Sequence, residues 1–141
     1  MRVCAHRRLV FAVLTRDEHC PPHVHVGTDK WEARFEFSFW DNSVRLWDVV
    51  PAQRSPSASL LEELRRVLKK PENLKKARQL WWRSRQTVCL ENQHWDASVQ
   101  AVVSPITRRS GAVAILSGQF DASRYRTTLL VANEDQVEIQ L

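Results

Sequence analysis

The chain has 141 residues, an ordinary globular composition and a formal net charge of +5. This length suits one domain with its own hydrophobic core, and the three glycines form none of the glycine-rich loops that cradle phosphates in nucleotide-binding proteins. No apolar stretch reaches the length of a membrane span, and the short apolar run near the N-terminus lacks a signal-peptide cleavage site. We therefore expect a cytoplasmic protein with no membrane partner.

The first third of the chain predicts a meander of antiparallel strands. One segment, residues 31–39, alternates strictly between apolar and polar side chains, which is the period of a half-buried strand. Before it, the pair Pro21-Pro22 forces extended backbone, and after it the turn residues 41–43 are typical of a hairpin. We expect strands over residues 8–15, 23–26, 31–39 and 44–50.

Two amphipathic helices are predicted after this meander. Apolar residues recur at helical spacing, Pro71 interrupts the pattern, and Ser59 with Glu62 has the spacing of a capping box. We expect helices over residues 58–70 and 72–87. Because helices that cover one face of an antiparallel sheet bury both apolar faces, the predicted fold class is α+β.

The last third of the chain is predicted to be a β-rich extension. Turn clusters separate short segments rich in β-branched residues, which indicate three or four strands, over residues 98–103, 112–116, 127–131 and 136–141. A separate domain of about 45 residues would be marginally stable on its own. We therefore expect a single domain over residues 1–141, in which residues 90–141 pack on an α+β core formed by residues 8–88.

The cysteines predict free thiols. The chain has an odd number of cysteines, and they are widely spaced, at Cys4, Cys20 and Cys89. No pair has the CxxC spacing of a zinc or redox site. This pattern favours a reducing compartment over a disulfide framework.

The histidines lie in the stretch with the densest titratable chemistry. In a strand, His23 and His25 would point the same way, and two imidazoles on one face can bind one divalent metal ion. Asp17, Glu18 or His19 would then complete the ligand set. We expect no other cofactor.

Two other interpretations of these histidines remain open. In a metal-free enzyme acting on RNA, His19, His23 and His25 would exchange protons with the substrate and Arg34 would hold its phosphate. Alternatively, the histidines stabilise the turn before the strand through hydrogen bonds to the backbone. The residues alone do not decide whether the protein is an enzyme.

The positive charge is concentrated in the two predicted helices. Residues 60–89 carry nine Lys and Arg against three Asp and Glu, which is typical of a surface that binds nucleic acid or an acidic partner. A solvated helix face would have the same composition. The basic residues are Arg65, Arg66, Lys69, Lys70, Lys75, Lys76, Arg78, Arg83 and Arg85.

The stretch DEHCPPHVHV at residues 17–26, followed by WEARFEF at residues 31–37, resembles a small prokaryotic family, domain-of-unknown-function family 4160. The resemblance covers residues 8–88, and the extension from residue 90 is absent from the short members. Glu18 stands where the family has an Asp directly before the first His. The matching residues are Asp17, His19, Pro21, Pro22, His23, His25, Val26, Glu32, Ala33 and Phe35, with a looser match at Leu64, Leu80 and Trp81.

This resemblance implies a role in bacteria. Some members of the family are considered toxins of type II toxin–antitoxin pairs, so the chain would be a toxin-like component that acts on RNA or translation and binds a small antitoxin-like protein. The residues themselves support two alternatives: a non-catalytic module that binds nucleic acid or protein through its basic helices, and a metal-binding domain that uses His23 and His25.

Overall fold

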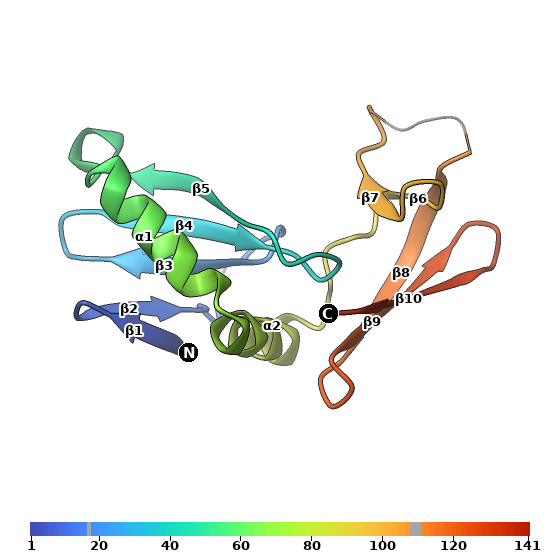
Figure 1. Cartoon of the computed structure of the whole chain (residues 1–141), viewed down its shortest axis with the longest axis horizontal. Helices are drawn as coiled ribbons and strands as arrows, with labels where there is room; N and C mark the ends of the chain where they lie inside the picture. Colours follow the sequence, from blue (N-terminus) through green and yellow to red (C-terminus); the bar gives the residue numbers. More distant parts are fainter. Residues whose placement is uncertain (17, 108–110) are drawn as a thin grey trace. The chain divides into compact units, whose positions relative to one another are not determined.

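The computed structural model describes residues 1–16, 18–107 and 111–141. Within this part of the chain, the backbone forms two five-stranded antiparallel sheets and two α-helices, which confirms the α+β fold class (Figure 1). The contacts divide the chain into two compact units. The first comprises residues 1–38 and 42–85, and the second comprises residues 39–41 and 86–141. That the extension packs on the core of a single domain stays a prediction.

The sheet of the first unit is an antiparallel meander in the order β1-β2-β3-β4-β5. Its strands are β1 Arg2–His6, β2 Leu9–Ala12, β3 His23–Gly27, β4 Glu32–Phe37 and β5 Val44–Val50. The strand expected over residues 8–15 is shorter, and the sequence analysis missed β1, which pairs with it. The turn between them consists of Arg7 and Arg8, both with positive φ, so this hairpin lacks the Asn or Gly that usually marks such a turn.

Both helices belong to the first unit. They are α1 Ala58–Lys69 and α2 Pro71–Arg85, after a short 3₁₀ turn over Ala52–Arg54. The predicted capping box is wrong, because the cap is Ser57, whose hydroxyl accepts a hydrogen bond from the Leu60 N–H at 3.1 Å. Pro71 ends the first helix as predicted, and it is the first residue of the second, where its missing N–H costs nothing.

The helices pack on the apolar face of the meander, with α1 along β5 and α2 against β1 (Figure 1). In β4, Ala33, Phe35 and Phe37 are buried, as the alternation predicted, and the Phe37 ring meets the Trp81 ring of α2 at 6.3 Å. The fully buried side chains of this unit include Phe11, Val13, Val24, Phe35, Leu64, Leu68, Leu74 and Trp81. The polar residues of β3 and β4 alternate with these core residues, and the buried His23 ring lies 5.5 Å from the Trp81 ring.

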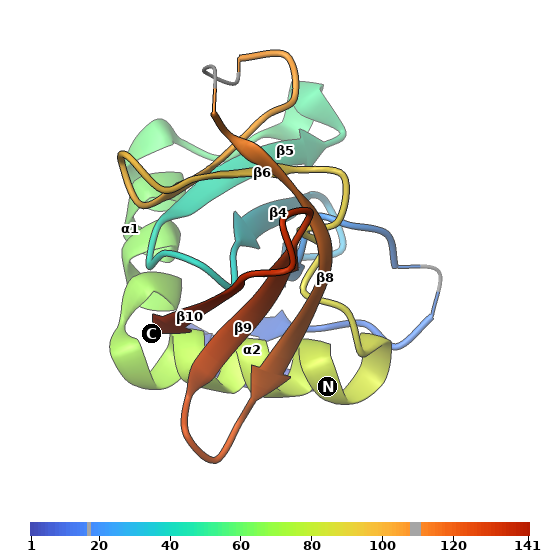
Figure 2. The ribbon, with the colours of Figure 1, turned by 90° about the vertical axis from the view of Figure 1, so that its right-hand side faces the viewer.

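The second unit contains a sheet in the order β10-β9-β8-β6-β7. Its strands are β6 His94–Asp96, β7 Ala101–Val103, β8 Val113–Asp121, β9 Arg126–Val131 and β10 Gln136–Gln140, of which β8, β9 and β10 lie side by side in Figure 2. The four predicted strands are present with shifted ends, but β6 was not predicted. Gly118 faces the core of this unit, where an added Cβ would come within 2.3 Å of Val88 Cγ2.

The prediction of free thiols is right only for Cys4, whose pKa is raised by burial. Cys20 and Cys89 are disulfide-bonded. The prediction of free thiols is therefore wrong for Cys20 and Cys89, and the reducing compartment stays a prediction. Among the described residues, neither helix is long and apolar enough to cross a membrane.

Candidate metal centre

The register of β3 and β4 gathers polar side chains on the outer face of the first sheet. His23 lies opposite Glu36 and His25 opposite Arg34, while Val24 and Val26 fill the core on the other face. A slip of one residue would remove both valines from the core and place both imidazoles in it, so the core fixes the side on which the histidines lie. The predicted shared orientation of His23 and His25 is confirmed, with their ring centroids 5.0 Å apart.

One carboxylate joins the two imidazoles. Glu18, in the loop before β3, places Oε1 3.0 Å from Nε2 of His25 and Oε2 in contact with Nε2 of His23. The ligand atoms of the three residues lie within 4.8 Å of one another. The side chains of Glu18, His23 and His25 are only 6%, 2% and 14% exposed. The cluster is therefore largely shielded from water.

The opposite ring nitrogens of both histidines face acceptors. Nδ1 of His23 lies 2.8 Å from the Pro21 carbonyl oxygen, and Nδ1 of His25 lies 2.5 Å from Oε1 of Glu32. A carbonyl or carboxylate oxygen can only accept, so we assign the proton of each neutral imidazole to Nδ1. Nε2 of each ring then presents a lone pair toward Glu18.

At His23, this arrangement brings two hydrogen-bond acceptors together, the Nε2 lone pair and the Glu18 carboxylate. Burial lowers the pKa of His23, against the opposing effects of its hydrogen bond to Pro21 and of the Glu18 carboxylate, and so favours the neutral ring. Nε2 of His23 is buried and finds no hydrogen-bond partner among the described residues, although Glu18 touches it. A neutral imidazole cannot donate from this atom, so the contact is unfavourable until a cation lies between the lone pair and the carboxylate.

The donor set matches known classes of metal site. Two imidazole nitrogens and one carboxylate form the protein ligands of several catalytic zinc sites and of non-haem iron(II) sites. Such sites commonly tie the second nitrogen of each ligating histidine to a carbonyl or carboxylate, as Pro21 and Glu32 do here. Three protein ligands leave at least one coordination position for water or substrate.

An arginine with a fixed orientation lies beside this cluster. Nε of Arg34 donates to Oδ1 of Asp48 at 2.7 Å, Nη2 donates to Oδ2, and Cζ lies 4.1 Å from the centroid of the Trp47 ring. The hydrogen bond to Asp48 raises the pKa of Arg34, and the same bond lowers the pKa of Asp48. The Trp47 ring also meets His23 edge-on at 5.0 Å. Arg34 and His23 thus share one aromatic neighbour.

The structure brings together some of the predicted site residues and leaves others apart. His19 is exposed and lies outside the ligand cluster of the described residues, and Asp17 lies outside the described residues. Glu18, one of three proposed third ligands, is the residue that joins the histidines. The sequence analysis missed the roles of Glu32 and Trp47. The alternation of residues 31–39 already placed Glu32 on the polar face with Arg34, but no sequence signal marked Trp47, which lies at a bulge between β4 and β5.

The basic residues form a less uniform surface than predicted. Arg65 and Arg66 both pair with Glu62 of the same helix, and Arg65 also donates to the Val44 carbonyl. Arg78 is wrongly placed by the sequence analysis, because it is fully buried and its Nε donates to the Ser38 carbonyl at 2.8 Å. The remaining basic residues of the predicted binding set, Lys69, Lys70, Lys75, Lys76 and Arg83, are exposed. A nucleic-acid or acidic partner stays a prediction.

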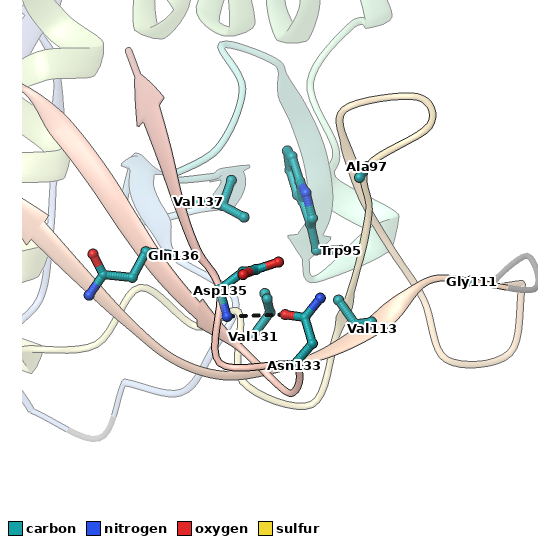
Figure 3. Close-up of a pocket in the computed structure, with 9 residues that line it drawn as sticks. All are labelled: Trp95, Ala97, Gly111, Val113, Val131, Asn133, Asp135, Gln136 and Val137. Atoms are coloured by element: carbon teal, nitrogen blue, oxygen red, sulfur yellow. Dashed lines mark hydrogen bonds between the residues drawn. The ribbon is translucent and has the colours of Figure 1, made fainter.

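The second unit contains a hollow of about 260 Å³ whose lining does not suit a metal (Figure 3). Its lining includes the apolar side chains of Trp95, Val113 and Val131 and the polar side chains of Asn133 and Asp135. The Asn133 side-chain oxygen already accepts a hydrogen bond from the Asp135 N–H at 3.1 Å. With no histidine or cysteine among its lining residues, this hollow offers a metal ion a single carboxylate. The cluster around Glu18 is the better candidate.

No family model, curated protein or solved structure matches the chain. The resemblance to family 4160, the toxin-like role and the antitoxin-like partner therefore stay predictions.

Proposed function

We propose that this protein binds a divalent transition metal ion through Glu18, His23 and His25, with zinc as the first choice and iron(II) as the second. The observation that carries the proposal is the common orientation of the two imidazoles. Both Nδ1 atoms face acceptors, and both Nε2 atoms are directed at one carboxylate. Three donor atoms thus converge in a shielded position, where a cation would remove the conflict between the His23 lone pair and Glu18.

The same contacts favour metal binding over the other interpretations of the histidines. A general base must reach the proton that it takes from a substrate, whereas His23 is 2% exposed, its Nδ1 lies against the Pro21 carbonyl oxygen and its Nε2 lies against Glu18. A purely structural role with neutral rings would require each Nε2 to donate to Glu18, which would leave each Nδ1 lone pair against an acceptor. Only a cationic ring donates from both nitrogens, and burial disfavours that form at His23. Metal coordination satisfies all four ring nitrogens together.

Metal content and affinity test this proposal. We expect the purified full chain to bind about one equivalent of zinc, measured by elemental analysis and by calorimetric titration after chelator treatment. Since loss of an outer-sphere partner already weakens metal sites by about 10- to 100-fold, Glu18→Gln, His23→Ala and His25→Ala should each weaken binding by more than about 100-fold.

The matched control is His19→Ala, which removes an exposed imidazole of the same loop. Its affinity for zinc should equal that of the wild-type chain. Binding of well under one equivalent by the wild type, for zinc, iron(II) and nickel(II) alike, would refute the proposal. An equal loss in His19→Ala and His23→Ala would refute the ligand assignment.

A further inference from the structure

We propose that the metal centre takes its substrate through an oxyanion group, a carboxylate or a phosphate, which Arg34 holds beside the metal ion. This inference rests on the proposed metal binding. It assigns to Arg34 a positioning role toward substrate that is separate from the metal ligands.

Arg34 has the right place in the sheet. It lies directly opposite His25 in the antiparallel pairing of β3 and β4, on the face that carries the ligand cluster. Side chains opposite each other in such a pair have Cβ atoms about 5 Å apart. A ligand bound to a metal at Nε2 of His25 is therefore within reach of a long side chain at position 34.

The guanidinium is held in one orientation, with one end unused. Asp48 receives hydrogen bonds from Nε and Nη2, which lie along the side of the guanidinium, and the Trp47 ring supports its face. Among the described residues, no other group accepts a hydrogen bond from Arg34, and its side chain is 30% exposed. The Nη1 end thus keeps its donors for an acceptor that arrives from solvent, and an oxyanion fits this fork best.

The neighbouring charges favour a small anionic group. Asp48 balances Arg34, and Glu18 and Glu32 together balance a divalent ion. Because a histidine that ligates a metal ion is neutral, the loaded site has a formal charge near zero. Such a site attracts a polyanion weakly, whereas one oxyanion can bind the metal through one oxygen and Arg34 through another. Trp47 is 39% exposed and forms an aromatic wall beside the same site.

Anion titrations of the cobalt(II)-loaded full chain test this inference. Cobalt(II) replaces zinc in sites of this type and reports changes in its ligands through visible absorption bands. We expect inorganic phosphate or acetate to shift these bands, with a dissociation constant of about 1 mM for the better ligand. The comparison of the two anions distinguishes a phosphate-bearing from a carboxylate-bearing substrate.

Variants separate the role of Arg34 from general charge effects. Arg34→Ala should weaken anion binding by about tenfold or more, because it removes charge-assisted hydrogen bonds. Arg34→Lys keeps the charge but lacks the planar fork, and should weaken it by less. The control is Arg45→Ala, which removes an exposed arginine paired with Glu36 opposite it on β4, and anion binding should stay unchanged.

Metal titration of each variant is run in parallel, so the two proposals fail in distinguishable ways. Unchanged anion affinity in Arg34→Ala, with metal binding intact, would overturn the role of Arg34 alone. Bands that respond to neither anion in the wild type would overturn the oxyanion inference and leave the metal centre standing. A wild-type chain that takes up no metal would overturn both.

Discussion

The ligand cluster around Glu18 and the basic surface of α1 and α2 differ in how their charges are held. In the cluster, a partner orients each polar group, and the partners lie on the loop before β3 and on β3, β4 and β5. The ligand side chains are also shielded from water. On the helices, Arg65 and Arg66 pair with Glu62 of the same helix, and the side chains of Lys69, Lys70, Lys76 and Arg83 are exposed. A high density of charge along the sequence therefore does not by itself create a binding site. A site requires partners that fix the orientation of a few polar groups.

The largest expected effect is stabilisation by zinc, which should depend on the ligand cluster and not on the basic surface. With zinc at about 1,000 times its dissociation constant, ligand binding should raise the free energy of unfolding of the wild-type chain by about 4 kcal/mol. This gain should vanish in His23→Ala, because a ligand is lost, and should be reversed by a chelator. Denaturant unfolding with and without zinc measures it.

The control for this prediction comes from the basic surface. Lys75→Ala with Lys76→Ala removes two exposed charges of α2 and should retain the full stabilisation by zinc. A zinc effect of the same size in His23→Ala would contradict the assignment of the cluster. An effect lost in the lysine variant would show that zinc binds elsewhere.

The second prediction concerns the residue that orients His25. Glu32→Ala removes the acceptor 2.5 Å from Nδ1 of His25, which should weaken zinc affinity by about 10- to 100-fold, as for other outer-sphere partners. Calorimetric titration measures the change. Glu36→Ala is the matched control, since Glu36 lies on the same face of β4 but pairs with Arg45. Equal affinities in the two variants would mean that Glu32 does not orient the ligand.

The third prediction contrasts two arginines of α2. Arg78 is fully buried and donates to the Ser38 carbonyl, so Arg78→Met should lower the free energy of unfolding by about 2 kcal/mol through loss of a charge-assisted hydrogen bond. Arg83 is exposed, and Arg83→Met should change stability by less than about 0.5 kcal/mol. Chemical denaturation of both variants tests whether Arg78 is a structural arginine while Arg83 is a solvated one.

The sequence predicted the parts of the fold that depend on periodicity. The alternation over residues 31–39 identified β4 and the face that carries Arg34, because a two-residue period has one structural solution. β1 was missed because its turn is Arg7-Arg8, and turn chemistry normally depends on Gly or Asn at positive φ. β6, with only three residues, is too short to show a period.

Only the part of the candidate site that follows from strand geometry could be predicted from the sequence. His23 and His25 had to share a face, whatever the rest of the chain did. The choice of Glu18 over Asp17 or His19 depends on how the loop before β3 folds back, which no local pattern encodes. Similarly, the position of Trp47 follows from a bulge in the pairing of β4 with β5, and bulges leave little trace in a single sequence.

The smallest expected effect concerns Glu62, which lies on the basic surface of α1 and α2. Hydrogen bonding to Arg65, with Arg66 nearby, lowers the pKa of this carboxyl to about 2 from its ordinary value of 4.5. Because the pKa is lower in the folded chain, the contribution of these pairs to stability is complete above pH 4.5 and is lost as the pH falls toward 2. Carboxyl NMR titration should find the midpoint near 2 in the wild type and closer to 4.5 in Arg65→Ala. A midpoint near 4.5 in both chains would mean that solvent screening removes the pairing, and the helix charges would then act independently.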